Sequence, residues 1–255
     1  MHGVRHPVDV LDRAEALLSE GLSFREVGRR MGLHYSTIIY WYRKGFDAMR
    51  SGYRAAGDCS VHEPIPASDY AYLLGLYLGD GTLSQGARLR AKGIDRLRIF
   101  CDAKYPRIIE ACADAMKSVL PNKVGVGLRE GCREVHSDSK HWPCLFPQHG
   151  PGRKHERPIV LEPWQIEIVT LRPKEFLRGL IHSDGCRCIN RVTVRGKRYE
   201  YPRYFFSNHS LDIQQMFRDV CEHLGIQCQQ HGPWEISVAK RDSVALLDTF
   251  VGPKS

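Results

Sequence analysis

The chain has 255 residues, of which 42% are hydrophobic and 26% are charged, a composition typical of a globular protein. The formal net charge of +8 favours a polyanionic partner, and nucleic acid is the first candidate. There is no apolar signal-peptide core and no apolar run as long as a membrane span, so we expect neither a secreted nor a membrane protein. Nine cysteines without regular spacing are typical of reduced thiols, which predicts a cytoplasmic protein.

Residues 1–55 are predicted to form a helix-turn-helix domain. A first helical stretch is followed by Ser23 and Glu26, which make a capping-box pattern at the start of a second helix. Gly32 breaks the chain before a third helix, and Gly28 is small enough to let two helices approach each other. The apolar positions expected to pack inside this domain are Met31, Leu33, Ile38 and Trp41.

The third helix, expected over residues 35–44, is the predicted recognition helix. A helix-turn-helix protein places this helix in the major groove of DNA, where exposed side chains reach bases and phosphates. The side chains expected to do so are Ser36, Thr37, Tyr40, Arg43 and Lys44. The alternative is a three-helix packing module that binds no DNA.

After a linker expected at residues 56–69, one short helical motif occurs twice. It is first "YLLGLYLGDG" and later "FLRGLIHSDG", and both copies fit the pattern L-x-G-L-x-x-x-D-G. Small residues lie four apart in each copy, Gly75 with Gly79 and Gly179 with Ser183. Residues at that spacing share one face of a helix, so we expect the two helices to pack closely around an approximate twofold axis.

Each copy of the motif ends in Asp-Gly. The last carbonyl groups of a helix carry the negative end of its dipole, which disfavours a carboxylate at Asp80 or Asp184 unless a cation joins it. Carboxylate and backbone carbonyl oxygens are the ligands of Mg²⁺ or Ca²⁺. The predicted metal-binding residues are therefore Asp80, Asp184, Gly79 and Ser183. An aspartate that merely ends a solvated helix is the alternative.

At these residues the chain resembles the LAGLIDADG homing endonucleases, in the form that carries both motifs on one polypeptide. The resemblance implies an α+β fold of two pseudo-symmetric α-β-β-α-β-β-α halves with saddle-shaped antiparallel sheets, here residues 70–174 and 175–255. "PWQIEIV" and "PWEISVA" are interpreted as a second matched pair, one strand in each half. On this alignment the segment from about 130 to 162 is an insertion in the first half.

The segments after the two motifs are expected to form basic hairpins. Period-two alternation places cations on one face of a sheet, whereas Val192 and Val194 pack on helices at the other face. Guanidinium groups suit phosphates and guanine edges, so this face is predicted to bind double-stranded DNA. The cations assigned to it are Arg88, Arg90, Lys92, Arg96, Arg98, Arg187, Arg191, Arg195, Lys197 and Arg198. A solvated basic surface is the alternative.

The resemblance also implies a mechanism, in which Asp80 and Asp184 hold divalent ions that promote hydrolysis of one phosphodiester bond in each DNA strand. Family members often place a lysine or glutamine near the last strand of each half, and Lys240 matches this place in the second half. In the first half the matching position is Thr170, with Arg172 nearby, so the basic partner there is open. Because both motifs lie on one chain, we expect a monomer.

The expected insertion contains Cys132, His136, His141 and Cys144, whose spacing can ligate zinc but fits no known finger pattern. Three functions therefore compete: a Mg²⁺-dependent site-specific endonuclease of homing type, a non-cleaving transcriptional regulator on the same fold, and a zinc-stabilised structural or RNA-binding protein. The two aspartates favour the enzyme. The helix-turn-helix and the absent first-half lysine favour the regulator.

Overall fold

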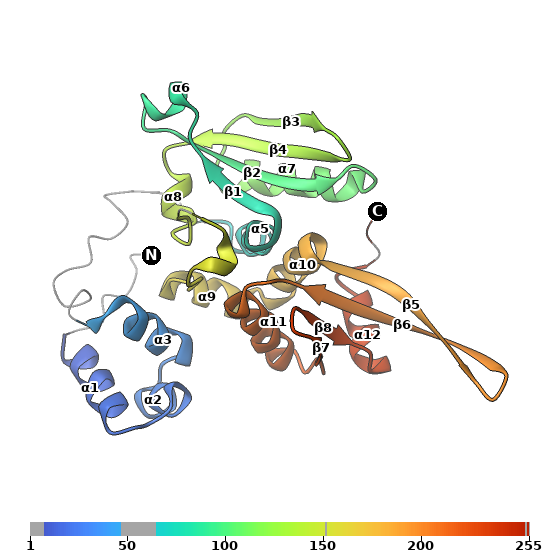
Figure 1. The fold of residues 1–255 in the computed structure, drawn as a ribbon. Helices are drawn as coiled ribbons and strands as arrows, with labels where there is room; N and C mark the ends of the chain where they lie inside the picture. The colour runs from blue at the N-terminus through green and yellow to red at the C-terminus, as the bar shows by residue number, and fades with distance from the viewer. Residues whose placement is uncertain (1–7, 47–64, 151, 253, 255) are drawn as a thin grey trace. The chain divides into compact units, whose positions relative to one another are not determined.

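The computed structural model describes residues 8–46, 65–150, 152–252 and 254, and this chain divides into two compact units. The first unit extends to Pro64 and also includes Val160–Glu167, and the second consists of Ile65–Ile159 and Ile168–Ser255 (Figure 1). The residues from 160 to 167 thus belong with the N-terminal helices, whereas the sequence placed them in the first half of the repeat. Across the described ranges, no helix combines the length and apolarity needed to cross a lipid bilayer.

The described N-terminal part of the first unit, residues 8–46, forms α1 (Val8–Ser19), α2 (Phe24–Met31) and α3 (Tyr35–Lys44). At the start of α2 the Ser23 hydroxyl accepts a hydrogen bond from the backbone N–H of Glu26. The Glu26 carboxylate accepts one from the backbone N–H of Ser23, so the predicted capping box is present.

Two glycines shape the turn between α2 and α3. Gly32 ends α2 with φ at 66°, in the left-handed region that glycine adopts without a steric penalty. A Cβ atom on Gly28 would lie 2.7 Å from the carbonyl oxygen of Leu33 and 3.0 Å from the Cα of Tyr35. Because these neighbours are backbone atoms, only glycine lets α2 lie this close to the start of α3.

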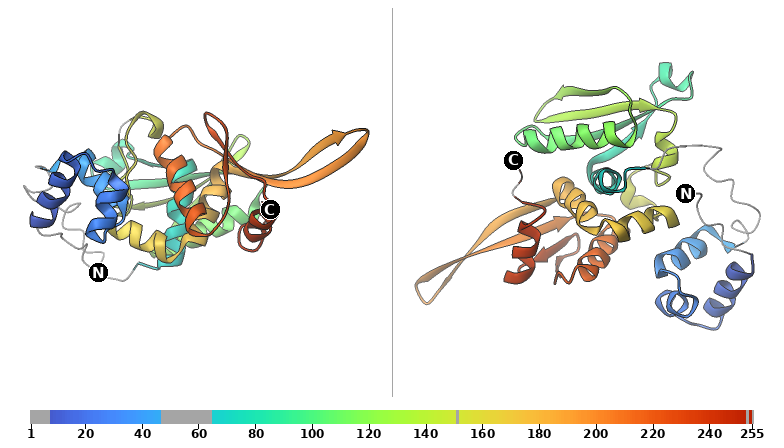
Figure 2. Two further views of the ribbon diagram at one scale, coloured as in Figure 1. Left: turned by 90° about the horizontal axis from the view of Figure 1, so that it is seen from below. Right: turned by 180° about the vertical axis from the view of Figure 1, so that it is seen from behind.

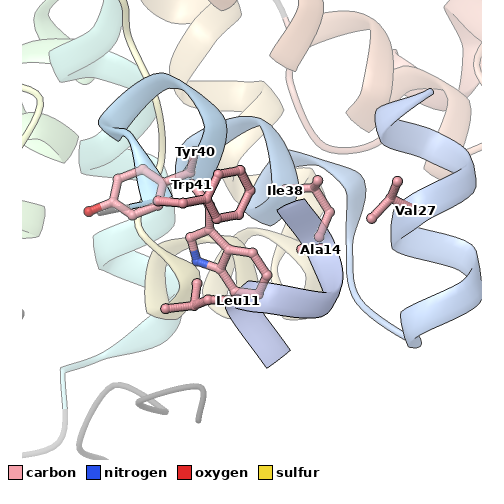
Figure 3. Close-up of a cluster of buried hydrophobic side chains, with 7 residues drawn as sticks. Leu11, Ala14, Val27, Ile38, Tyr40 and Trp41 are labelled. Atoms are coloured by element: carbon pink, nitrogen blue, oxygen red, sulfur yellow. The ribbon is translucent and has the colours of Figure 1, made fainter. Parts of the chain in front are cut away.

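A small hydrophobic cluster holds the three helices together (Figure 3). Its buried members are Leu11, Ala14, Val27, Ile38, Tyr40, Trp41 and Phe46. Of the predicted packing residues, Ile38 and Trp41 are buried, and Met31 and Leu33 pack at the edge of the cluster. Val160 also packs against it, which is why its segment belongs to this unit.

The second unit contains two halves with the same element order. The first half consists of α5 (Ala67–Asp80), β1 (Gly81–Ser84), the short helix α6 (Ala87–Arg90), β2 (Asp95–Asp102), α7 (Pro106–Val119), β3 (Val124–Arg129), β4 (Cys132–Ser139) and α8 (Trp142–Leu145). A 3₁₀ turn, η1 (Lys154–Glu156), and α9 (Pro163–Leu171) lead to the second half. That half consists of α10 (Pro173–Asp184), β5 (Gly185–Val194), β6 (Lys197–Ser207), α11 (Leu211–His223), β7 (Gln229–Gly232), β8 (Glu235–Val238) and α12 (Arg241–Asp248). Apart from α6, both halves have the order α-β-β-α-β-β-α, and the predicted α+β fold is confirmed.

Each half contains one four-stranded antiparallel sheet, with the strand order β1-β2-β4-β3 in the first and β5-β6-β8-β7 in the second. The glycine that ends each motif is also the first residue of a strand. Gly81 pairs with Ile99, and Gly185 pairs with Phe206. The same register in both sheets makes Ile99 and Phe206 equivalent positions.

One predicted strand of the first half, "PWQIEIV", is not a strand. "PWQIEIV" is helical and belongs to α9, and the true counterpart of β8 is β4, inside the segment that the sequence treated as an insertion. Val135 of β4 pairs with Ile99 just as Ile236 of β8 pairs with Phe206. Pro163 starts α9, where the missing N–H of proline costs nothing. The sequence of β4, "CREVHSDS", is mostly polar and so does not indicate a central strand, although its backbone is paired with strands on both sides.

The motif helices α5 and α10 pack with their backbones in contact, as the repeat predicts. A Cβ atom on Gly75 would lie 2.5 Å from the carbonyl oxygen of Phe176 and 2.8 Å from the Cα of Gly179. Such distances are impossible for a real side chain next to a backbone that cannot move aside. The glycines therefore set the separation between the two halves.

We predict that Gly75→Ala destabilises the protein. Overpacking against a rigid backbone costs about 3 kcal/mol, and the better helix propensity of alanine returns about 1 kcal/mol, so the net loss is about 2 kcal/mol. Urea unfolding of the full chain measures this loss. Gly86→Ala is the control, because a Cβ atom there meets nothing within 4 Å. Equal stabilities for the two variants would contradict the close helix contact.

Candidate active site at the ends of the motif helices

Asp80 and Asp184 are the last residues of α5 and α10, and the helix packing brings them to one place. A Cβ atom on Gly79 would lie 2.9 Å from Oδ2 of Asp184, so this carboxylate lies against the end of the other motif helix. Asn208 Nδ2 donates a hydrogen bond of 2.6 Å to the same oxygen. Asp80 also lines a cavity of about 220 Å³ beside Ser183. The two carboxylates singled out by the repeat therefore share one site.

The surroundings of the two carboxylates disfavour their negative charges. Burial, and after it the neighbouring charge of Asp184, raise the pKa of Asp80 to about 6, against the opposing charges of Lys154 and Lys254. Burial also raises the pKa of Asp184, against the hydrogen bond from Asn208 and the charges of nearby lysines. Two adjacent, partly buried carboxylates cost free energy unless cations offset them. The site therefore attracts positive charge.

Lys154 supplies one cation within the protein. Its Nζ donates hydrogen bonds to the last carbonyl oxygens of α5, those of Tyr77, Leu78 (3.0 Å) and Gly79 (2.9 Å). Burial lowers the pKa of Lys154 to about 8, while the charges of both aspartates oppose this change. The ammonium group adds a donor to the last carbonyl oxygens of the helix, of which that of Tyr77 also accepts from the backbone N–H of Gly81, and it meets the negative end of the helix dipole.

Lys254 occupies the related position at the end of α10. Its Nζ donates a hydrogen bond of 3.2 Å to the carbonyl oxygen of Ser183, and it lines the same cavity as Asp80. The sequence analysis missed both lysines. A signal was present, however, because "GPGRK" and "GPK" each follow the last helix of a half and end in Lys154 or Lys254.

The predicted set of metal ligands fits only in part. The carbonyl oxygens of Gly79 and Ser183 accept hydrogen bonds from Lys154 and Lys254, so these two groups are already occupied. The carboxylates of Asp80 and Asp184 remain suitable ligands. In the described part of the chain, no group of three or more His, Cys, Asp and Glu side chains could hold a metal ion. Mg²⁺ is commonly held by one or two carboxylates with waters and substrate phosphates, and the two aspartates meet that requirement.

Lys240 lies at the N-terminal end of α12 and is exposed. Its counterpart in the first half is not Thr170, which lies in α9. Since Val135 matches Ile236, the same step along each chain matches Ser139 with Lys240, and Lys140 follows directly. The cations that lower the pKa of Asp80 are Lys154 and Lys254. The catalytic assignment of Lys240 stays a prediction.

The four residues considered for zinc are spread over two elements. Cys132 and His136 lie on β4, where four residues of extended chain span about 13 Å, and His141 and Cys144 lie at α8. The described residues contain no metal-binding group of His, Cys, Asp and Glu, so these four side chains do not form a zinc site. Their spacing suggested ligands only while the segment was taken for a loop.

The first sheet carries Arg96 and Arg98 on β2, alternating with buried residues as predicted. Both are paired with carboxylates of β4. Arg96 makes a two-pronged contact with Asp138 at 2.6 and 2.8 Å, and Arg98 lies 3.4 Å from Glu134. These partners hold the guanidinium groups in place and reduce the positive charge of this face.

Arg88, Arg90 and Lys92 do not lie on a strand, contrary to the expected alternation. Residues 87–90 form α6 instead, because the strand that pairs with β2 already begins at Gly81. The structure still places Arg88 and Lys92 with Arg96 and Arg98 around one surface depression. Their shared site is thus produced by a loop that folds back over the sheet.

In the second half, β5 and β6 form a long two-stranded ribbon that extends beyond the rest of the sheet (Figures 1 and 2). Only the last four residues of β6 pair with β8. Val192 and Val194 were expected to pack on helices, but they are 38% and 51% exposed. Arg191 shares the phase of Arg187, which bonds Asp248 of α12. Cations and apolar residues therefore alternate along β5 as predicted, but among the described residues no helix covers the part of the ribbon that contains Val192 and Val194.

The tip of the ribbon is a tight turn. Arg195 has φ at 50° and Gly196 has φ at 76°, so Arg195 lies in the turn and not in a strand as expected. Lys197 begins β6. Arg191 and Arg198 both pair with Glu200, at 2.9 and 3.2 Å.

The helix α3, predicted to be the recognition helix, is more deeply packed than expected. Thr37 and Tyr40 are buried, at 6% and 4% exposure, and the Tyr40 hydroxyl donates a hydrogen bond of 3.0 Å to Glu162. Ser36 is half-buried, with Oγ 2.7 Å from Nδ1 of His34. Arg43 is exposed, as is Tyr42, which the sequence analysis missed, and the side chain of Lys44 lies outside the described part. Thr37 and Tyr40 are core residues because α3 also packs against the segment from 160 to 167.

Neither a protein-family model nor a curated protein sequence matches this chain. Among solved structures, I-DmoI in complex with DNA and Ca is 18% identical, with a TM-score of 0.46 over 72% of this chain and 89% of that chain. The LAGLIDADG meganuclease I-AabMI bound to uncleaved DNA is 11% identical, with a TM-score of 0.46 over 71% and 82%. A mutant of I-SmaMI is 8% identical, with a TM-score of 0.45 over 72% and 84%. At these identities the similarity concerns the fold, and function is inferred from the residues at the two motifs.

We predict that Asp80→Asn stabilises the protein at neutral pH. Because the pKa of Asp80 is raised to about 6, the folded protein retains a proton between about pH 4 and pH 6 that the unfolded chain has lost. Stability therefore falls as the pH rises through this range, and at neutral pH the charged Asp80 costs about 3 kcal/mol. Thermal unfolding in EDTA across this pH range measures the gain. Asp114→Asn, at a carboxylate that is 76% exposed, is the control and should show no such gain.

Proposed function

We propose that the protein is a site-specific DNA endonuclease of homing type that hydrolyses phosphodiester bonds of double-stranded DNA with Mg²⁺ in the cytoplasm. The observation that carries the proposal is the pair of motif helices in backbone contact, whose ends bring Asp80 and Asp184 together. A helix dipole and burial both disfavour the negative charges of the two aspartates. A helix end with only a structural role could avoid this loss of stability by using an uncharged residue. Their retention in both halves supports a catalytic use.

In this proposal Asp80 and Asp184 hold the metal ion, which when bound supplies Lewis-acid stabilisation and lowers the pKa of a water molecule. Asn208 fixes the orientation of the Asp184 carboxylate through its 2.6 Å hydrogen bond. Lys154 and Lys254 add positive charge beside the two aspartates, which would favour a DNA phosphate there. The I-DmoI and I-AabMI structures, which contain DNA, have the same kind of fold.

We assign DNA binding to three surfaces. The depression lined by Arg88, Lys92, Arg96 and Arg98 would bind phosphates mainly through Arg88 and Lys92, because Arg96 and Arg98 are paired with carboxylates, and the β5–β6 ribbon offers further cations at its tip. The exposed side of α3 with Tyr42 and Arg43 would lengthen the recognised site. Because both motif helices are already paired within one chain, the protein is proposed to act as a monomer.

A non-cleaving transcriptional regulator is the second candidate. The helix-turn-helix unit favours it, because a capped α2, a left-handed Gly32 and a helix with an exposed arginine suffice for DNA binding without chemistry. The first-half position that matches Lys240 is Ser139, so the absent first-half lysine still favours this candidate. Cleavage of DNA decides between the two.

We expect Asp80→Asn and Asp184→Asn to abolish cleavage without loss of DNA binding. Each change removes a metal ligand, and a loss of about 4 kcal/mol of transition-state stabilisation lowers the cleavage rate about a thousandfold. Binding depends mainly on phosphate contacts elsewhere and should be unchanged. The target is first selected from a randomised duplex library in Mg²⁺, and cleavage and Ca²⁺-supported binding are then measured on it. Undiminished cleavage by the double variant would exclude the catalytic role, and a parent protein that binds but never cleaves would establish the regulator.

The helix-turn-helix is predicted to add affinity but no chemistry. Tyr42→Ala and Arg43→Ala should each weaken binding to the selected duplex roughly tenfold, as expected for the loss of one good contact to DNA. Cleavage at saturating protein should be unchanged. Arg13→Ala on α1, which is also exposed, is the matched control. Loss of cleavage at saturation would show that the unit takes part in the chemistry.

A further inference from the structure

The ends of the two motif helices are equipped in the same way. In the sequence, each half is followed by Gly-Pro and then a lysine. Lys154 donates hydrogen bonds to the end of α5, and Lys254 donates one to the end of α10. Each ammonium group donates to the terminal carbonyl oxygens of its helix and lies within the electrostatic reach of Asp80 and Asp184. Two carboxylates thus lie within the electrostatic influence of two ammonium groups that are bonded to the helix ends.

The segment that carries Lys154 is closed by a contact of its own and also packs against the second half. The Glu156 carboxylate accepts a hydrogen bond of 3.2 Å from the backbone N–H of Arg153, which closes the 3₁₀ turn. The ring of His155 packs against that of His209 with the centroids 5.4 Å apart, and His209 follows Asn208, the partner of Asp184. Lys154 is therefore held at the first aspartate by contacts that also involve the residues around the second.

We propose that Lys154 and Lys254 are built-in counter-ions that hold the two aspartates together before any metal binds. This inference rests on the proposed function and deepens it, because it assigns two positioning residues to the same site. Without the ammonium groups, two carboxylates and two negative helix ends would meet with no positive charge between them. With them, the helix ends can pack in the metal-free protein, and a divalent ion enters a site that is already formed.

The counter-ion role of Lys154 makes its contribution to stability depend on metal and on Asp80. In EDTA, Lys154→Met should lower the Tm by about 6 °C or more, since one partner of a partly buried charge group is lost. Added Ca²⁺ should restore much of this loss, because the ion supplies the missing positive charge, and it should raise the Tm of the parent protein less. A side chain that merely packs would lower the Tm equally in EDTA and in Ca²⁺.

The experiment uses the full chain and compares the parent, Lys154→Met, Asp80→Asn and the double variant by thermal unfolding in EDTA and in Ca²⁺. Lys140→Met is the matched control, because Lys140 is exposed in the turn after β4. If Lys154 offsets the charge of Asp80, its loss should lower the Tm in the Asp80→Asn background by less than half as much as in the parent.

Equal losses in the two backgrounds would overturn the proposal, as would a Lys154→Met protein as stable in EDTA as the parent. If Lys154→Met does not fold in EDTA, recovery of folding in Ca²⁺ or with Asp80→Asn supports the counter-ion, and failure to fold in both refutes it. If Ca²⁺ changes the Tm of none of these proteins, that result would count against the metal site of the proposed function. The coupling between Lys154 and Asp80 in EDTA would then still decide the counter-ion role.

Discussion

The backbone contact between α5 and α10 is the constraint on which the second unit depends. At Gly75 no side chain larger than hydrogen fits against the other helix. Once the backbones touch there, the ends of both helices meet one turn further along, and Asp80 and Asp184 become neighbours. The glycine that ends each helix starts a strand directly, so the same contact also sets where both sheets begin.

This contact brings two negative charges together, and side chains from other parts of the chain offset some of their repulsion. Two carboxylates, each at the negative end of a helix dipole, repel one another when brought together away from water. Lys154 and Lys254 supply the opposite charge from the segments that follow each half, and Asn208 donates to one carboxylate. The lysines and Asn208 offset only part of the cost, since the pKa of both aspartates is still raised.

On the surfaces proposed to bind DNA, the side chains that are available depend on contacts that the sequence pattern does not show. Arg96, Arg98 and Arg191 are each paired with a carboxylate of a neighbouring strand, so counting cations overstates the charge available to a phosphate. In α3, Thr37 and Tyr40 are taken up by the core. What remains exposed depends on packing with segments that are distant in sequence, and this is why the sequence predicted the exposure of these side chains less well than the meeting of the two aspartates.

The sequence by itself determined the features that depend on local pattern. The repeated L-x-G-L-x-x-x-D-G predicted the helix contact, the pairing of Asp80 with Asp184 and the two-halved fold, because spacing along one helix fixes which residues share a face. Only the tertiary structure showed that the polar β4 is a central strand, that "PWQIEIV" is helical and that Lys154 reaches the first motif. Strand identity and long-range ammonium contacts depend on partners far away in the chain, and no local period encodes those partners.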